Sequence, residues 1–443
     1  MNIVEEGVHV ARQCFDYGAV DMDLPTSCRQ FLSLDPYHVE GAILMADLAL
    51  ETGPEAYPEA IEHVSRALTQ HRDVWRLYDR LGDLLRFSGR LPVAQFHYDK
   101  ALELGPTNPE TIYKSARLRF LRGILNEAEA LLKHSLTLDV HHAPSQLLIS
   151  LVHQAQTATG DASFTTLKEL EAMQGALLGD NGWQGSPFVE GTEPNQEAPR
   201  TFACMSHPKC GTHLLNDVML GLSGLDYSWT RDDDVECVNE RMPALTEENQ
   251  YVIGHWWAGK GWVSRMQEEG SRGVIQYRDP RDQLVSYYYF CRDVTENDPH
   301  SEMLRSLPEE EAIRCLINGF NEQAMGNPTE MGLWLAHWIR ADVPTYLSSF
   351  ERMIHDKPQT VAEIGRFTGY PKSRAQCDVI TRDTAFNRRS KTVEEHNLSE
   401  KGFKRKGKSG DWRNHFSLLS KRRFKKSHGE LLMLMGYEKD LAW

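Results

Sequence analysis

The stretch TFACMSHPKCGTHLLNDVMLGLSGL, residues 201–225, decides how the second half of the chain folds. It begins with a short apolar run, passes through a turn that contains Pro208, Lys209 and Gly211, and ends in an amphipathic helical pattern. A strand, loop and helix in this order place backbone N–H groups at a helix N-terminus, where they and a lysine can bind an anion. The alternative is a plain strand–turn–helix. GxxxxGK[ST] is absent, which argues against an ordinary P-loop ATPase, GTPase or nucleotide kinase.

Short apolar runs continue to alternate with helical patterns after this stretch. TFACMS, YVIGHW, GVIQYR and PTYLSSF begin at residues 201, 251, 273 and 344. Strands that alternate with helices predict a parallel α/β sheet.

Two further segments carry residues suited to anion binding. In YRDPRDQLVSYYYF, residues 277–290, Arg278 follows a predicted strand, at the edge where ligands bind in open α/β sheets. Ser286 lies eight residues later, about two helical turns on. In GFKRKGKSGDWRNHFS, residues 402–417, three glycines permit a tight loop, and Arg405 and Lys406 can close over a phosphate.

In this order, PKCGTH, YRDPRDQLVSYYYF and RKGKSGDWRNHF resemble the motifs of sulfotransferases that use 3′-phosphoadenosine 5′-phosphosulfate (PAPS). The resemblance covers residues 199–443 and implies a P-loop-like α/β domain with a central parallel sheet. It implies that PAPS is the co-substrate and that no metal is needed, because Lys and Arg carry the positive charge.

The resemblance also assigns residues to the nucleotide. It implies a 5′-phosphosulfate site formed by Lys209, Gly211, Thr212 and His213, and a 3′-phosphate site formed by Arg278, Ser286, Arg405, Lys406 and Gly407. Cys210 stands where the family usually has Ser, and Leu214 where it often has Trp, so one wall of the adenine site is expected to be aliphatic. TAF, residues 384–386, is similar to an adenine-contacting element of the family. Phe386 is therefore a candidate to stack on adenine, with an ordinary core residue as the alternative.

The resemblance places a catalytic histidine after the second predicted strand, at His255. A histidine near pKa 6.5 is a suitable general base for an alcohol or phenol. Asp217 is the alternative base, since some glycan-directed relatives use an acid on this helix. The family's lysine two residues before the histidine is missing, and Lys260 is a candidate to replace it. Lys209 would neutralise the leaving oxygen, and Ser286 would hold Lys209 aside until both substrates are bound.

The first third of the chain contains a repeat with the period of tetratricopeptide helix pairs. Leu68, Leu102 and Leu136 are 34 residues apart, and Leu32 precedes the first of them by 36. The best copy begins at Trp75. The region resembles the tetratricopeptide family over residues 1–155, which predicts an all-α repeat domain, a helix and linker at 156–198, and the α/β domain from 199. Such repeats recruit a partner or support self-association; an unrelated helical bundle is the alternative.

Composition limits the other classes of function. The chain has 443 residues and a net charge of −14, which argues against a nucleic-acid binder. Residues 401–426 nevertheless contain eleven Lys or Arg and one acid, which indicates a local anion site; the run KRRFKK, 421–426, is expected to be a solvated helix face. The absence of a CxxC pair argues against structural zinc. No apolar run is long enough for a membrane span. The N-terminus lacks the basic flank and the apolar run of a signal peptide, which argues against secretion. We therefore expect a cytoplasmic protein whose cysteines are reduced.

The acceptor is less defined by the sequence. Several aromatic residues near the predicted site suit an aromatic or amphipathic acceptor, although aromatic residues beside a sheet are often core: Trp256, Trp257, Trp262, Tyr287, Tyr288, Tyr289 and Phe290. A small molecule, a glycan and a peptide remain open. The alternative function is a tetratricopeptide scaffold with a catalytically silent nucleotide-binding domain.

Overall fold

The computed structural model describes residues 3–17, 23–105, 107–157, 164–180, 188, 201–230, 250–294, 301–319, 327–386 and 405–443. The chain divides into two compact units: residues 1–158 with 417–443, and residues 159–416. The predicted boundaries at 155 and 198 stay predictions, and nearly all of the predicted linker after residue 180 lies outside the described residues. Among the described residues, no helix has both the length and the apolar character of a membrane span.

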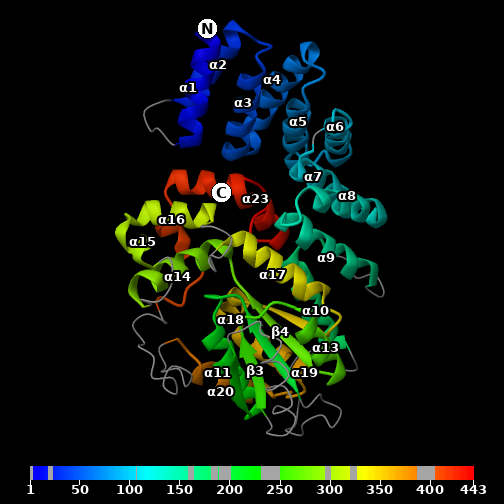
Figure 1. Ribbon diagram of the computed structural model, residues 1–443, viewed down its shortest axis with the longest axis vertical. Coiled ribbons are helices and arrows are strands. Elements are labelled where there is room, and N and C mark those ends of the chain that lie inside the picture. Colours follow the sequence, from blue (N-terminus) through cyan, green and yellow to red (C-terminus); the bar gives the residue numbers. More distant parts are fainter. Residues whose placement is uncertain are drawn as a thin grey trace. The chain divides into compact units, whose positions relative to one another are not determined.

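In the first unit, helices follow one another as antiparallel pairs, as Figure 1 shows. The pairs are α1 (Ile3–Tyr17) with α2 (Leu24–Leu34), α3 (Val39–Thr52) with α4 (Tyr57–Gln70), α5 (Trp75–Phe87) with α6 (Leu91–Glu103), and α7 (Pro109–Leu121) with α8 (Leu125–Leu138), followed by α9 (Ala143–Thr157). The leucines of the 34-residue period occupy equivalent places on the second helices α4, α6 and α8. The predicted tetratricopeptide-like repeats are confirmed.

The repeat that begins at Trp75, which matches the sequence pattern best, shows why small residues recur at fixed places. Ala94, Tyr98 and Ala101 on α6 are fully buried. A Cβ atom at Gly82 on α5 would lie 2.5 Å from the Tyr98 ring, so only glycine allows this approach of the two helices. The Tyr98 hydroxyl donates to Asp83 Oδ1 at 2.7 Å, which satisfies its buried oxygen.

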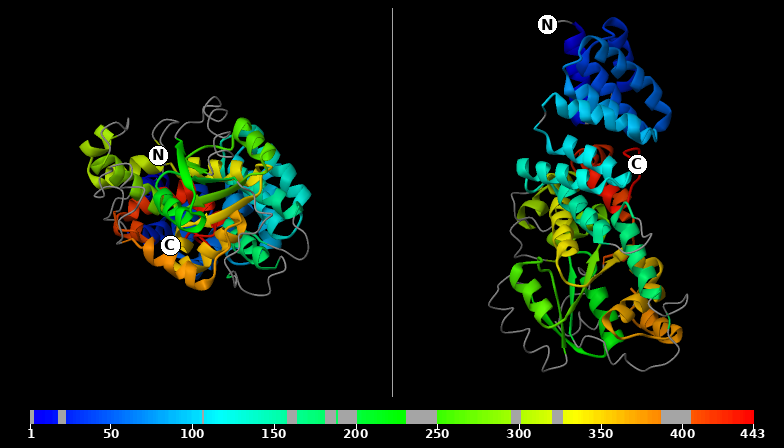
Figure 2. Two further views of the ribbon diagram at one scale, coloured as in Figure 1. Left: turned by 90° about the horizontal axis from the view of Figure 1, so that it is seen from below. Right: turned by 90° about the vertical axis from the view of Figure 1, so that its right-hand side faces the viewer.

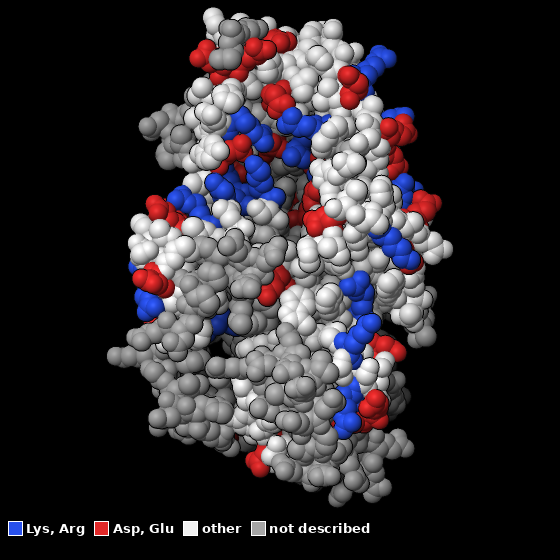
Figure 3. Space-filling model, in the orientation of Figure 1, with Lys and Arg blue, Asp and Glu red and all other residues white. Residues whose placement is uncertain are grey.

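The C-terminal helix α23 (Leu418–Met435) belongs to the first unit, where it contacts the first helices of the pairs. Glu430 accepts hydrogen bonds from Arg86 on α5 and Arg117 on α7, and Arg422 pairs with Glu51 on α3 at 2.9 Å. The prediction of a solvated face for 421–426 is therefore wrong: Phe424 is fully buried and Arg422 forms an ion pair. Figure 3 shows Lys and Arg gathered over α1, α5 and α23, with acidic side chains among them.

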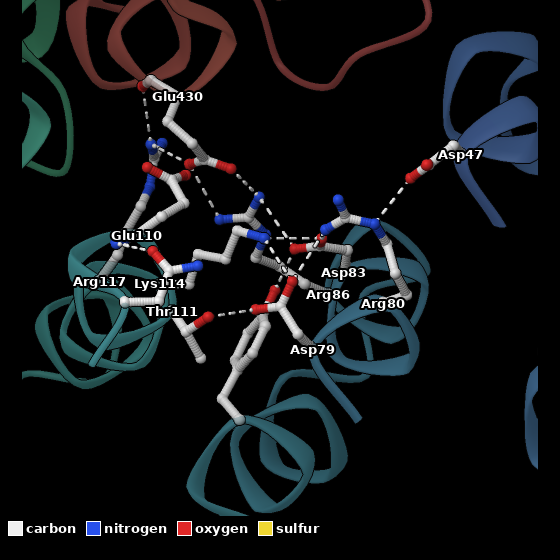
Figure 4. Close-up of polar contacts among 12 residues, drawn as sticks. Asp47, Asp79, Arg80, Asp83, Arg86, Glu110, Thr111, Lys114, Arg117 and Glu430 are labelled. Carbon is white, nitrogen blue, oxygen red and sulfur yellow. Dashed lines mark hydrogen bonds and ion pairs between the residues drawn. The ribbon is translucent and has the colours of Figure 1, made fainter. Parts of the chain in front are cut away.

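Buried ion pairs continue from α23 into the repeats (Figure 4). Lys114 Nζ lies 3.0 Å from Asp79 Oδ2 and 2.8 Å from Asp83 Oδ2. Burial alone would lower the pKa of Lys114, but the two aspartate charges outweigh it and hold that pKa above its ordinary value. The repeats thus satisfy their buried charges within the chain.

The second unit contains a five-stranded parallel sheet of order β2-β3-β1-β4-β5, so the predicted α/β architecture is confirmed. Its strands are β1 (Phe202–Ser206), β2 (Asp226–Thr230), β3 (Gln250–Gly254), β4 (Arg272–Tyr277) and β5 (Thr345–Ser349). Its described helices are α10 (Leu167–Asp180), α11 (Thr212–Ser223), α13 (Lys260–Glu268), α14 (Pro280–Asp293), α15 (Ser301–Ser306), α16 (Glu309–Asn318), α17 (Pro328–Arg340), α18 (Phe350–His355), α19 (Lys357–Thr368), α20 (Arg374–Asp383) and the short η3 (Asp411–Asn414).

The sheet brings the ends of distant strands together. All five residues of β1 are buried, as expected for a central parallel strand. Figures 1 and 2 show the strands side by side, with α11 and α19 packed against the sheet. Since parallel strands end at the same edge, the residues after β1, β3 and β4 meet there, and the chain changes direction around β1, where such sheets bind ligands.

The Glu430 network generates a prediction about stability. Glu430→Gln removes the charge that faces Arg86 and Arg117, whose side chains are 6% and 11% exposed. We expect the free energy of unfolding of the first unit to fall by about 2–4 kcal/mol, because two buried cations lose their partner. Urea denaturation followed by circular dichroism measures this. Glu103→Gln, on a surface pair with Lys100, is the control and should cost less than about 0.5 kcal/mol; equal losses would contradict the account.

Candidate functional site

The loop after β1 forms a concave turn at the N-terminus of α11. Lys209 and Gly211 both have positive φ, of 66° and 96°. A Cβ atom at Gly211 would lie 2.7 Å from the Phe350 ring and 2.9 Å from Gln276 Nε2, so only glycine fits. The left-handed turn therefore depends on glycine, and it lies at the N-terminus of α11, where the first N–H groups of a helix can bind an anion.

Arg278, the first residue after β4, joins this loop to the C-terminal loop. Its Nη1 donates to the carbonyl of Lys209 at 3.3 Å, and its Nη2 donates to the carbonyl of Lys408 at 3.1 Å. The guanidinium lies 4.2 Å from the centre of the Phe350 ring, and Arg278 is only 6% exposed. One buried cation thus connects all three segments that the sequence singles out.

The second and third segments are also joined through Asp282. Its carboxylate accepts hydrogen bonds from the backbone N–H of Gly410 at 2.5 Å and of Trp412 at 2.9 Å. Beside it, the Arg281 guanidinium lies 4.1 Å from the centre of the Trp412 ring and pairs with Asp279 at 2.8 Å. These contacts fix the loop that carries Arg405–Gly410 against the N-terminus of α14.

Lys209 is the principal positive group of the loop after β1. Its Nζ lies 4.0 Å from the centre of the Phe290 ring. Phe290 follows Ser286 by one helical turn on α14. Burial, and then the charge of Arg278, lower the pKa of Lys209 to about 8. Two cations that repel each other in a buried place favour an anion between them.

His255 follows β3, next to the end of β1. Its Nδ1 lies 2.7 Å from the carbonyl oxygen of Ser206. Because a carbonyl only accepts, Nδ1 donates to it. The ring packs edge-on against Trp229 at 5.8 Å. Asp217, the alternative base, lies farther along α11, and Lys260 is exposed at the start of α13.

The remaining candidate residues of the loop after β1 have distinct surroundings. Thr212 exchanges a hydrogen bond with the Ser206 hydroxyl, and the His213 ring stacks on Trp229 at 5.6 Å. Cys210 is fully buried, and burial raises the pKa of its thiol well above the ordinary value. Leu214 packs against the hydrophobic core beside the sheet.

The C-terminal loop brings Arg405, Lys406 and Gly407 to the same region. Arg405 Nη2 lies 2.6 Å from Asp411 Oδ2, and Lys406 Nζ lies 2.9 Å from Asp411 Oδ1. Gly407 has a φ of 61° and lies directly against the Phe386 ring. Phe386 is 46% exposed, so it is not the core residue that the alternative predicts.

Sequence reasoning missed the amides that shape the loop after β1. Gln276 Nε2 donates to the carbonyls of Cys210 and Gly211 at 3.0 and 3.2 Å, and Gln283 Nε2 donates to the carbonyl of Pro208 at 3.1 Å. A glutamine inside an apolar strand was the one available signal. Among the aromatic candidates, Trp256, Trp262, Tyr287 and Tyr288 are core residues, whereas Trp257, Tyr289 and Phe290 are partly exposed.

Comparison with known proteins identifies related chains. A family model for the sulfotransferase domain matches residues 161–436. A 3-alpha-hydroxysteroid sulfotransferase of Cavia porcellus is 29% identical over 263 residues, which are 54% of this chain and 85% of the relative. Flavonol 3-sulfotransferase of Flaveria bidentis is 25% identical over 267 residues, 53% of this chain and 84% of the relative. The crystal structure of mouse sulfotransferase SULT7A1 complexed with PAP matches with a TM-score of 0.42 and 19% identity, covering 58% of this chain and 91% of that one.

The turn after β1 offers a matched pair of glycine substitutions. Gly211 and Gly224 flank α11 and both have positive φ, but a Cβ atom at Gly224 would meet nothing within 4 Å. We expect Gly224→Ala to lower the free energy of unfolding by about 1–2 kcal/mol through backbone strain alone. Gly211→Ala should cost at least about 1 kcal/mol more, because its methyl group also meets Phe350 and Gln276. Urea denaturation compares the two; equal losses would contradict the close-approach argument.

Proposed function

The chain belongs to the sulfotransferase family, and we propose that it moves the sulfuryl group of PAPS to a hydroxyl or amine of an acceptor by in-line displacement. The observation that carries the proposal is Arg278, whose guanidinium joins the loop of Lys209 to the loop of Lys408. Arg278 is itself a cation, and it binds the backbone of the two loops that carry Lys209 and Arg405. A nucleotide with an anionic group at both its 3′ and its 5′ position is the ligand that such an arrangement suits best.

The residues present fit the two ends of the nucleotide. For the 5′-phosphosulfate we propose the backbone of the glycine turn, Lys209, Thr212 and His213. Arg278, Ser286, Arg405, Lys406 and Gly407 would receive the 3′-phosphate. The exposed face of Phe386, held against Gly407, suits stacking on adenine. Leu214 packs into the core, so its contribution to the adenine wall stays a prediction.

His255 is proposed as the general base. The Ser206 carbonyl holds the Nδ1 proton, which leaves Nε2 to take the proton of the acceptor hydroxyl. The acceptor oxygen then forms a bond to sulfur as the bond between sulfur and the bridging phosphate oxygen breaks. The products are the sulfated acceptor, adenosine 3′,5′-bisphosphate (PAP), and a proton on His255. Asp217 remains the alternative base.

Lys209 is proposed to stabilise the bridging oxygen as its charge develops. Its ammonium now lies over the Phe290 ring, on the side of α14 that carries Ser286 one turn earlier. This position supports the proposal that Ser286 holds Lys209 aside until both substrates are bound. Positioning and fixed cations supply most of the catalysis in such group transfers.

The proposed acceptor is a hydroxyl on a small amphipathic or aromatic molecule. The relatives named for steroid and flavonol acceptors support this class, as do the partly exposed rings of Trp257 and Phe290. Labelled PAPS incubated with steroid, phenol, glycan and tyrosine-peptide panels tests it. Sulfation confined to glycans or peptides would overturn the acceptor class, and PAP binding without transfer to any acceptor would favour the silent scaffold.

The repeats are proposed to serve a protein partner or self-association. In the first unit, α23 already occupies part of the face formed by the first helices of the pairs. A partner that uses this face must therefore displace or accommodate the chain's own helix. The cytoplasmic location stays a prediction.

The base assignment predicts a specific defect. His255→Ala should lower the transfer rate at least about 100-fold, because the acceptor proton loses its destination. PAP affinity, measured by isothermal titration calorimetry, should stay within a few-fold of wild type. Full turnover in His255→Ala would contradict the assignment; in that case Asp217→Asn identifies whether the alternative base acts.

The lowered pKa of Lys209 predicts a pH dependence of nucleotide binding. Below pH 8 the free protein already holds Lys209 protonated, and above it the proton must be taken up when the anion binds. PAP affinity should therefore fall as pH rises through about 8, by as much as about tenfold per unit. Lys209→Arg, which stays charged, should give a flatter profile. A wild-type affinity that is constant from pH 7 to 9.5 would contradict the proposed contact.

A further inference from the structure

A cluster of polar side chains lies behind Arg405, and two of its members have no assigned role: Glu309 lies outside the sequence motifs, and His415 lies near the end of the third one. Glu309 is the first residue of α16, and His415 directly follows η3. The His415 Nδ1 lies 2.5 Å from Glu309 Oε1, and its Nε2 lies 3.2 Å from Asp411 Oδ2. The histidine therefore links an acid from a separate helix to the acid that binds Arg405.

The imidazole of His415 is enclosed on several sides. Both ring nitrogens lie within reach of a carboxylate oxygen, and the His415 side chain is 9% exposed. The hydroxyl of Tyr289 donates to Glu309 Oε2 at 3.1 Å, and the edge of its ring packs against His415 at 5.3 Å. The position of His415 is thus fixed by contacts from α14, α16 and η3.

These contacts in turn determine the direction of Arg405. Its Nη2 lies 2.6 Å from Asp411 Oδ2, its Nη1 lies 3.5 Å from His415 Nε2, and its guanidinium lies 4.7 Å from the centre of the Tyr289 ring. The side chain is 19% exposed, so one side stays open to a ligand. An arginine held in this way loses less conformational entropy when it binds an anion.

The charge distribution around Asp411 supports the same role for His415. The Asp411 carboxylate faces Arg405, Lys406 and His415 and also accepts from the Asn414 amide, so its single negative charge is divided among four partners. Without His415, the carboxylate would pair more fully with Arg405 and compete with an incoming anion. The histidine therefore both orients the arginine and limits this competition.

We propose that Glu309 and His415 are positioning residues that hold Arg405, through Asp411, for the 3′-phosphate of the nucleotide. The inference rests on the proposed function. Neither residue touches the nucleotide, and both act through Arg405. Their effect must therefore be confined to ligands that carry a 3′-phosphate.

The experiment compares two nucleotides in each variant by isothermal titration calorimetry. PAP carries the 3′-phosphate, and adenosine 5′-monophosphate lacks it. His415→Ala should weaken PAP binding about tenfold, the loss expected for a charge-assisted hydrogen bond, and Glu309→Gln several-fold. Binding of adenosine 5′-monophosphate should stay within about twofold of wild type in both.

Two reference variants complete the design. Arg405→Ala should remove most of the preference for PAP. Glu310→Gln changes the neighbouring acid on α16, which pairs with Arg314, and should leave both affinities unchanged. Thermal unfolding of each variant shows whether it is folded.

The outcomes separate the inference from the proposed function. Equal losses for both nucleotides in folded His415→Ala protein, or no loss for either, would overturn the positioning role. If the preference for PAP disappears in Arg405→Ala while Glu309→Gln and His415→Ala keep it, the 3′-phosphate site stands and the inference fails. If wild-type protein shows no preference for PAP, the proposed function itself fails.

Discussion

The site depends on one guanidinium. Arg278 follows β4 and donates to a carbonyl 69 residues earlier and to another 130 residues later. It reaches both because the parallel sheet ends β1 and β4 side by side and because Asp282 binds the backbone of the C-terminal loop at Gly410 and Trp412. Without these contacts, nothing described above would hold the loop of Lys209 and the loop of Arg405 next to each other. With them, the three segments are joined before any ligand arrives, as the proposed nucleotide site requires.

The two units handle buried charge in different ways. In the repeats, Lys114 lies between two aspartates and Arg86 faces Glu430, so positive and negative groups compensate each other within the chain. At the edge of the sheet, burial and the charge of Arg278 lower the pKa of Lys209. A cation whose charge is disfavoured in this way gains from an incoming anion. The first arrangement compensates buried charge within the fold, and the second is the one that the proposed anion site requires.

The sequence predicts the segments of the site but not the contacts that join them. The 34-residue period and the alternation of strands and helices come from local patterns, and the structure confirms both. Phe386 and Gly407 are candidates from motif positions, whereas Asp282, Gln276 and the cluster of Glu309 with His415 depend on pairings more than 60 residues apart. The basic run at 421–426 is misread for the same reason: its partner Glu51 lies 371 residues away.

The central claim is that three separate segments form a site for a nucleotide with a phosphate at its 3′ position. The most direct test measures the affinity of the wild-type protein for adenosine 3′,5′-bisphosphate and for adenosine 2′,5′-bisphosphate. The isomers have the same charge and differ only in where the second phosphate is attached. The account predicts that the 3′ isomer binds at least about tenfold more tightly, a difference of about 1.4 kcal/mol. Equal affinities would indicate general attraction to a basic surface and would contradict it.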